Sequence, residues 1–331
     1  MIRLLAVALA LTFASPAAHA QAFDGLKVFF CGTGGPLPIP DRAEPCTAIQ
    51  AGDALYVIDT GSGGAETLQR MRAPVAALKA IFITHLHSDH IGGLGEVNNQ
   101  SWIAGRAQPV PVIGPAGVDK LAQGFNLAYE RDHVFRRDHH ERGEVRFPLA
   151  AAKLQSRVIT IPKPDGTAVA WKDGELTVTA IRVAHDPVDP AFGYRFDYKG
   201  RSVVISGDTK PWPPLAAASK GADVLIHEAQ SNAMMRQISG MLANGGQPRT
   251  ASILADTVTY HTEPKEAADI ARAAGVKTLV LSHLTQAGLP LFNAEAFTRG
   301  IEDGGKIDWR LARDGMTIEL PAGSEEVKFG G

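Results

Sequence analysis

The sequence predicts a layered α/β domain. Apolar runs rich in β-branched and aromatic residues alternate with helical segments along most of the chain. Several of the predicted strands end directly before a histidine or a carboxylate. No Pro/Ser-rich linker, repeat or low-complexity run divides residues 21–331, so we expect these residues to form one domain.

Residues 1–20 are typical of a secretory signal. Arg3 precedes an apolar run over residues 4–13, and small residues lead to Ala20, after which we expect cleavage. No later stretch approaches about 20 uninterrupted apolar residues, the length needed to span a bilayer. We therefore expect a periplasmic or secreted protein without a membrane span.

The net charge bears on the possible partners of the protein, and the cysteines bear on a possible disulfide. The formal net charge of −2 does not favour long polyanions as partners. Cys31 and Cys46 are the two cysteines of an exported chain and could form a disulfide. Spacing alone does not fix the separation of their Cα atoms, so two buried thiols remain the alternative.

The first predicted elements lead to a glycine-rich turn and a β-meander. Residues 27–31 form a strand that runs into the glycines of residues 32–35, which do not match a phosphate-binding GxGxxG loop. Residues 46–51 and 54–59 form two further strands, and a short helix begins at Ala65.

A cluster of imidazoles follows the next strand, residues 78–84. Side chains alternate along an extended chain, so His85 and His87 project to one side and can bind one cation together. Asp89 and His90 follow as the chain turns and can face a second cation. Imidazole nitrogen and carboxylate oxygen are the ligands of catalytic zinc, so this stretch predicts a metal site.

The segment after the cluster predicts a helix over 94–104, a strand over 109–113 and a helix over 117–129. Residues 131–146 then combine five arginines and three histidines with four acidic residues. Two interpretations are open for this segment: a solvated, salt-bridged helix, or a lid that meets an anionic substrate.

The second half of the chain repeats the pattern of a strand followed by a chemically active side chain. Four strands deliver such side chains to one edge of a sheet, which is what a sheet-borne active site requires. They are residues 175–183 before His185, 202–206 before Asp208, 222–226 before His227 and Glu228, and 278–282 before His283.

The His-x-His-x-Asp-His pattern after an apolar strand resembles the signature of the metallo-β-lactamase superfamily. The match is closest to its ribonuclease Z-like branch, because Tyr260-His-Thr262 is similar to the histidine motif of that branch. Leu225-Ile-His-Glu-Ala229 is similar to its His-Glu-Ala-Thr segment, with Gln230 in the place of threonine. The resemblance implies a four-layer αββα sandwich with two mixed sheets.

The same resemblance implies roles for individual residues. Two zinc ions per chain would share seven ligands: His85, His87 and His185 for one ion, Asp89, His90 and His283 for the other, and Asp208 bridging both. A hydroxide shared by the two ions would be the nucleophile, and Asp89 is counted among the catalytic residues. His261 would be the general acid, oriented by Glu228, with His227 in a supporting role. Asp59 resembles a buried structural aspartate of the superfamily.

These residues predict a binuclear zinc hydrolase that acts on a phosphodiester or a related small ester. Ribonuclease Z carries a long tRNA-binding arm between the ligands that match His185 and Asp208, and only residues 186–207 lie there in this chain. We therefore expect a small-molecule ester substrate and do not expect tRNA. A homodimer remains open.

Three other functions are weighed against this hydrolase. The first alternative keeps the same metals but hydrolyses a lactone or a β-lactam, including promiscuous β-lactamase activity. A di-iron oxidase or persulfide dioxygenase is disfavoured because the second histidine of the motif, His87, is not replaced by a carboxylate. A binding protein without catalysis is disfavoured because no ligand position is lost.

Overall fold

The computed structural model describes residues 23–289 and 291–331. The predicted secretory signal, residues 1–20, lies outside the described residues. Among the helices that are described, none combines the length and the apolar character needed to cross a membrane.

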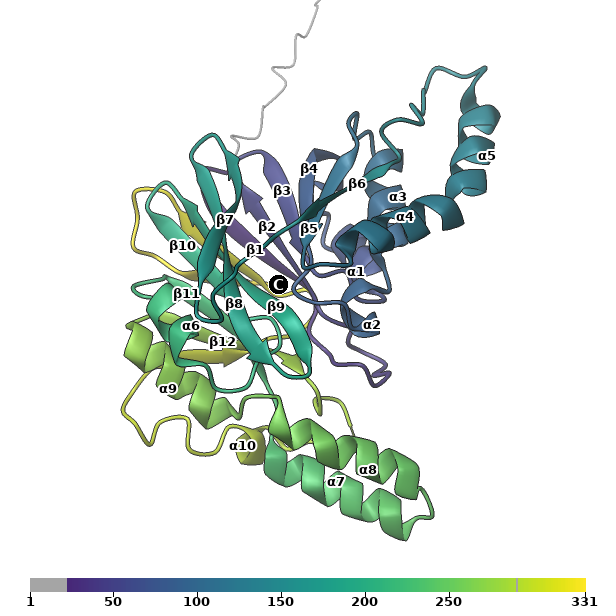
Figure 1. The fold of residues 1–331 in the computed structure, drawn as a ribbon. Coiled ribbons are helices and arrows are strands. Elements are labelled where there is room, and N and C mark those ends of the chain that lie inside the picture. Colours follow the sequence, from purple (N-terminus) through teal and green to yellow (C-terminus); the bar gives the residue numbers. More distant parts are fainter. Residues whose placement is uncertain (1–22, 290) are drawn as a thin grey trace, which may run out of the picture.

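Eight strands form the first sheet, in the order β15–β14–β1–β2–β3–β4–β5–β6 (Figure 1). Their bounds are β1 Gly25–Gly32, β2 Cys46–Ala51, β3 Ala54–Ile58, β4 Leu78–Phe82, β5 Val110–Gly114, β6 Leu154–Val158, β14 Thr317–Pro321 and β15 Lys328–Gly330. The pairs from β3 to β6 are parallel and the remaining pairs are antiparallel, so the sheet is mixed.

Seven strands form the second sheet, in the order β13–β12–β11–β10–β9–β8–β7. Their bounds are β7 Thr167–Asp173, β8 Leu176–His185, β9 Val188–Tyr198, β10 Arg201–Ile205, β11 Val224–Ala229, β12 Thr278–Leu284 and β13 Asp308–Leu311. This sheet is also mixed, because β7 to β10 pair in antiparallel fashion and β10 to β13 in parallel.

Some helices cover the outer faces of the two sheets, and others project from the body of the molecule. The first sheet is covered by α1 Gly64–Arg70, α3 Leu94–Ile103 and α4 Val118–Ala128. The second sheet is covered by α6 Pro213–Ala218, α9 Pro264–Ala274 and α10 Ala294–Phe297. Projecting from this body are α5 Glu130–His140 and a hairpin of α7 Asn232–Asn244 and α8 Pro248–Asp256 (Figure 1).

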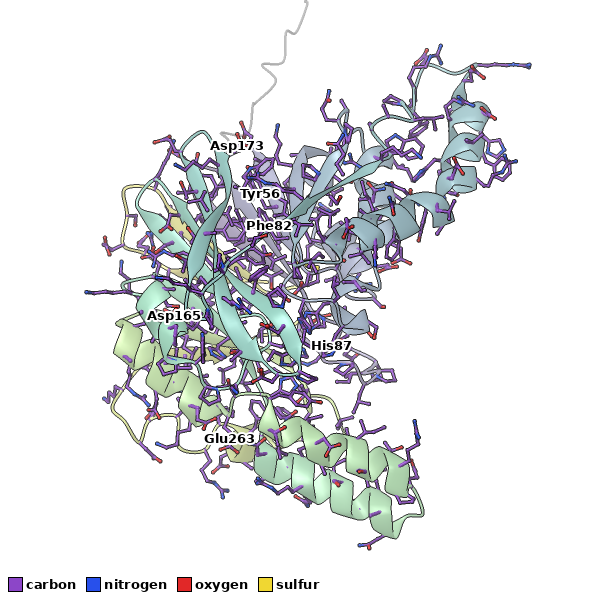
Figure 2. All side chains as sticks on the ribbon, viewed as in Figure 1. Tyr56, Phe82, His87, Asp165, Asp173 and Glu263 are labelled. Carbon is purple, nitrogen blue, oxygen red and sulfur yellow. A yellow bond between two sulfur atoms is a disulfide. The ribbon has the colours of Figure 1, made fainter. Side chains whose placement is uncertain are left out.

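The alternation of side chains on β1 shows how the layers are held together. Val28 and Phe30 point into the core between the two sheets, while Phe29 and Cys31 pack beneath the helices of the first sheet. Tyr56, on β3, reaches across the core and donates a hydrogen bond of 2.8 Å to Asp173 on β7 (Figure 2). The prediction of a four-layer αββα sandwich with two mixed sheets is confirmed.

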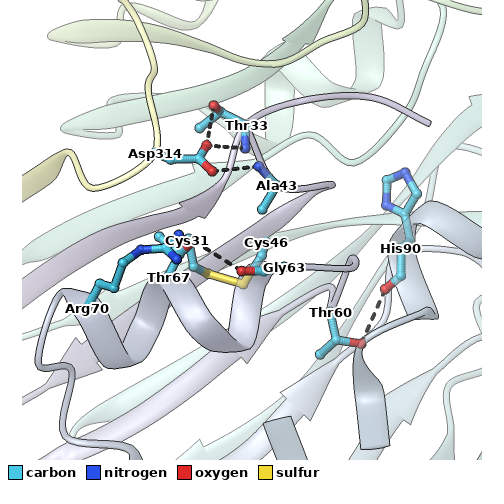
Figure 3. The surroundings of a disulfide bond; sticks show 10 residues. All are labelled: Cys31, Thr33, Ala43, Cys46, Thr60, Gly63, Thr67, Arg70, His90 and Asp314. Atoms are coloured by element: carbon cyan, nitrogen blue, oxygen red, sulfur yellow. Dashed lines mark hydrogen bonds between the residues drawn. A yellow bond between two sulfur atoms is a disulfide. The ribbon is translucent and has the colours of Figure 1, made fainter. Parts of the chain in front are cut away.

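A disulfide joins the two cysteines, which settles the alternative left open by the sequence. Cys31 on β1 and Cys46 at the start of β2 are buried, and their Cα atoms lie 4.9 Å apart (Figure 3). Gly64 packs against this bond so closely that a Cβ there would lie 2.8 Å from the Cys46 sulfur. The crosslink therefore fastens the first two strands beneath α1.

The half-buried carboxylate of Asp314 organises the glycine turn after β1. It accepts hydrogen bonds from the backbone N–H and the hydroxyl of Thr33, at 3.0 Å and 2.7 Å, and from the N–H of Ala43 at 2.6 Å (Figure 3). A Cβ at Gly35 would lie 3.4 Å from the imidazole of His283. The turn therefore approaches the edge where the predicted ligands gather.

Candidate metal centre

Three predicted ligands of the first cation come together. His85 and His87 follow β4, and His185 is the last residue of β8. Each offers a ring nitrogen within 4.8 Å of the other two. His85 Nε2 lies only 2.9 Å from His87 Nδ1, and the buried Nε2 of His185 has no hydrogen-bond partner among the described residues.

The three predicted ligands of the second cation form another group. Asp89 and His90 belong to the short helix α2 Ser88–Ile91, and His283 lies near the end of β12. His90 Nε2 lies 3.3 Å from His283 Nε2, and Asp89 Oδ2 lies 3.6 Å from each of these nitrogens. All three side chains are buried.

Asp208 lies between the two groups. Its Oδ2 is 3.9 Å from Nε2 of both His85 and His185, and 3.1 Å from His283 Nε2. Its Oδ1 is 3.4 Å from His90 Nε2. One buried carboxylate is therefore in reach of ligands from both groups, as a bridging role requires.

The seven side chains fit a pair of divalent cations. Burial lowers the pKa of His85 well below its usual value and also lowers the pKa of His185, so both rings are neutral and their lone pairs are available. Burial alone would raise the pKa of Asp208, but His283 and His90 outweigh it and hold that pKa well below its usual range. Burial alone would lower the pKa of His90, but Asp208 and Asp59 raise it well above its usual value, so His90 would release a proton when a cation binds. Imidazole nitrogens around an ionised carboxylate are the donor set of a binuclear zinc site.

Outer hydrogen bonds orient two of these histidines. Asp59 accepts from the N–H and the hydroxyl of Thr84, both at 2.8 Å, and its Oδ2 lies 2.8 Å from Nδ1 of His90. His185 Nδ1 donates to the carbonyl of Tyr260 at 3.1 Å. Such bonds fix the ring orientation and leave Nε2 for a metal. Asp59 occupies the structural position expected from the sequence.

His261 and Glu228 form a buried pair beside the ligands. His261 Nδ1 lies 3.0 Å from Glu228 Oε1, which also accepts from the backbone N–H of Thr209 at 3.1 Å. Burial alone would lower the pKa of His261, but the charge of Glu228 and the hydrogen bond to it raise that pKa to about 9. His227 is buried and its Nδ1 donates to the Glu228 carbonyl at 2.8 Å, so it contacts the backbone of this pair.

A cavity of about 260 Å³ connects these groups to the surface. Its lining includes Asp89, Asp208, His261 and His283, and the exposed His87 lies at the margin of the sheets (Figure 2). The cavity is also lined by side chains that the sequence did not identify as part of a site: Pro36, Leu37, Gln230, Met235, Leu254, Thr257, Tyr260 and Thr285. The apolar faces of residues 232–244 and 248–256 were the signal for the two helices that supply part of this lining.

The arginine-rich segment does not reach this cavity. Its helical part is α5, where Arg136 pairs with Asp132 at 2.7 Å and Arg137 with Asp138 at 2.6 Å. Residues 131–146 are absent from the lining of the 260 Å³ cavity. Of the two interpretations, the structure favours a salt-bridged surface helix over a lid.

The amino-acid sequence is similar to a known protein family and to individual relatives. Residues 55–284 match the family model described as the beta-lactamase superfamily domain. A ribonuclease Z of Mycobacterium bovis (strain BCG / Pasteur 1173P2) is 34% identical over 265 residues, which cover 79% of this chain and 87% of that protein. A ribonuclease Z of Mycobacterium marinum is 35% identical over 308 residues, covering 90% of this chain and 99% of the relative.

Solved structures share the fold. A metallo-beta-lactamase fold protein of Bacillus subtilis, YhfI, is similar with a TM-score of 0.60 and 21% identity, covering 89% of this chain and 99% of that chain. The short form of human tRNase Z has a TM-score of 0.60 and 23% identity, with the same coverage of 89% and 99%.

The relatives contradict one sequence-based expectation. A small-molecule ester as substrate, with tRNA not expected, is wrong, because relatives that align with most of this chain are named ribonuclease Z. The expectation depended on the short connection between His185 and Asp208, which the structure fills with β9 and β10. The short connection and the mildly negative charge were therefore not sufficient grounds to exclude tRNA.

Proposed function

This chain belongs to the beta-lactamase superfamily, in its ribonuclease Z-like branch, and on that basis we propose that it is a two-metal phosphodiesterase whose substrate is RNA. The observation that carries the proposal is the position of Asp208. Its carboxylate lies between two groups of predicted ligands, and His261 lines the same cavity as Asp208.

The predicted ligand set supports two zinc ions. His85, His87 and His185 would hold one, Asp89, His90 and His283 the other, and Asp208 would contact both. Two such cations, when bound, neutralise the charge that develops on a phosphoryl group and lower the pKa of water.

The side chains of this chain supply proton transfer and orientation. Because Glu228 engages Nδ1 of His261, the proton for the departing alkoxide is on Nε2. The raised pKa of His261 keeps that proton in place near neutral pH. Asp89 also lines the cavity, where its carboxylate would accept a hydrogen bond from the attacking water.

The names of the relatives support RNA as the substrate class, and a tRNA precursor is the sharpest test. Residues 21–331, loaded with zinc, should contain about two zinc ions per chain and should cleave a 3′-extended tRNA at one phosphodiester. Nitrocefin, offered at the same enzyme concentration, tests the β-lactam alternative. Turnover of nitrocefin with no cleavage of the tRNA precursor or of single-stranded RNA would overturn the proposal.

We also infer that the chain is exported. The signal-like residues 1–20 support export, and so does the Cys31–Cys46 disulfide, because disulfides persist in oxidising compartments. Expression in a Gram-negative host should give a periplasmic protein whose first residue, by N-terminal sequencing, is Gln21. A cytoplasmic protein that retains Met1 would contradict export without affecting the proposed reaction.

A further inference from the structure

The cavity next to the predicted metal ligands is lined by two chemically different sets of side chains. One set is ionic and consists of Asp89, Asp208, His261 and His283. The other, here called the apolar wall, has side chains from three separate segments: Leu37 from the turn after β1, Met235 from α7 and Leu254 from α8. A ligand that fills this cavity therefore needs an anionic part and an apolar part.

The apolar wall is fixed in place at the base of the α7–α8 hairpin. The backbone N–H of Ser231 donates to Gln286 at 3.1 Å, and that of Asn232 donates to Glu263 at 3.2 Å. Glu263 lies at the base of the hairpin (Figure 2). Met235 and Leu254 are 2% and 7% exposed, so they belong to the packed base of the hairpin and not to its exposed surface.

Polar groups border the apolar wall. The phenol ring of Tyr260 packs against the imidazole of His261, with ring centroids 4.9 Å apart, and lines the same cavity. The buried amide of Gln230 also lines it and accepts a hydrogen bond from Thr285 at 3.3 Å. A flat heterocycle between apolar side chains, with an amide at its edge, is the usual way in which proteins bind an unstacked base.

We propose that this wall is a nucleobase subsite, which takes the base of a nucleotide next to the scissile phosphate. The inference rests on the proposed phosphodiesterase function, because a phosphate held beside Asp208 and His261 would bring a neighbouring base into the same cavity as the apolar wall. Of the groups that flank a phosphodiester in RNA, the base is the one with apolar faces. Base stacking on protein side chains is strong enough to change affinity by roughly one to two orders of magnitude.

Three dinucleotides test the subsite: uridylyl-(3′→5′)-uridine and the two analogues in which one of the two bases is replaced by hydrogen. For the wild-type enzyme, removal of one particular base should raise KM about 10-fold or more, and removal of the other should have a smaller effect. Leu254→Ala should abolish most of that difference, because it removes a face of the subsite. Ile253→Ala is the matched control, since Ile253 is on the same helix, is 53% exposed and does not line the cavity.

Binding without turnover gives an independent readout. Ligand-observed NMR should detect uridine, and not ribose, on the wild type and on Ile253→Ala, with the signal lost in Leu254→Ala. If Leu254→Ala fails to fold by circular dichroism, Met235→Ala removes another side chain of the apolar wall, and Leu254→Met should restore the base preference.

The possible failures are distinguishable. Equal kcat/KM for all three dinucleotides in the wild type would overturn the subsite and leave the phosphodiesterase function intact. An equal loss on all three in the Leu254 and Met235 variants would do the same. No cleavage of any dinucleotide or of longer RNA by zinc-loaded enzyme would instead overturn the proposed function.

Discussion

The imidazole of His261 and the carboxylate of Glu228 are joined by a buried contact of 3.0 Å between Nδ1 and Oε1. His261 reaches this position from the segment before α9, and Glu228 from the end of β11. The pair lies next to the predicted metal ligands, with His261 and His185 ring centroids 5.4 Å apart, but it is outside their three groups. Proton delivery and metal binding can therefore be tested separately.

His261→Ala should retain both metals, because the seven predicted ligands are unchanged. It should lose about 10²-fold to 10⁴-fold in rate on an alkyl phosphodiester, whose leaving alkoxide needs a proton. The loss should be much smaller on a p-nitrophenyl phosphodiester, because p-nitrophenolate departs without protonation. Metal analysis and steady-state rates on both substrates check this. Equal losses on both substrates, or a lost metal, would mean that His261 binds or positions instead of donating a proton.

Glu228→Gln should shift the alkaline limb of the pH–rate profile to lower pH. A general acid acts in its protonated form, so the rate falls as pH rises through the pKa of His261. Glu228 raises that pKa to about 9 against the opposing effect of burial, and bound cations lower it in both proteins. In Glu228→Gln the neutral amide no longer opposes the effect of burial, so the pKa of His261 falls. Glu302→Gln, on the exposed surface, is the control and should leave the pH–rate profile unchanged. An alkaline limb that does not move in Glu228→Gln would show that Glu228 does not raise the pKa of His261.

Asp208→Ala should remove at least one of the two metals, since Asp208 is the carboxylate in reach of both groups of ligands. Activity should fall with the metal content. Elemental analysis by mass spectrometry gives the metal-to-protein ratio, and Asp197→Ala, at a surface aspartate paired with Arg195, is the control. Full metal content and full activity in the Asp208 variant would place Asp208 outside the site.

Replacing both cysteines by serine should lower the free energy of unfolding by about 3 kcal/mol, the loop-entropy value for a loop of this length. The disulfide closes a separation of 15 residues in sequence. Urea unfolding of the double variant and of the wild type measures the difference, and the wild type unfolded in reducing agent is the control. An unchanged urea midpoint for the double variant would show that the disulfide does not stabilise the fold by restricting the conformations of the unfolded chain.

The residues predicted as metal ligands could be found in the sequence because they follow strands whose patterns are readable on their own. The apolar run before His85 and the strand before His283 both appear where the sequence indicates them, as β4 and β12. Because β10, β11 and β12 are parallel neighbours, recognising these strands places the residues at their ends at one edge of the second sheet. The end of β4 belongs to the first sheet, and only the resemblance to the superfamily indicated that it meets this edge. The location of these residues at the sheet edges does not depend on the exact residue at which each strand ends.

The cavity wall was harder to predict, because its residues have no shared chemical signature. Met235 and Leu254 are ordinary apolar residues on helices, and their approach to His261 depends on how the hairpin leaves the sheet at Ser231. The strand β9 was likewise missed, since Pro190 and charged residues interrupt its pattern. Its residues form a strand because they are buried against the first sheet, and not because of their local strand propensity.

The hairpin between Ser231 and Thr257 enters and leaves the body within one stretch of chain, while the predicted metal ligands come from elsewhere. Beyond Met234, which packs into the core beneath the second sheet, changes in the length or composition of the hairpin would leave the two sheets in place. The proposed base-binding wall and the predicted metal ligands can therefore vary independently. Exchanging this one stretch for the corresponding segment of a relative should change the base preference that we propose and leave the predicted metal ligands unchanged.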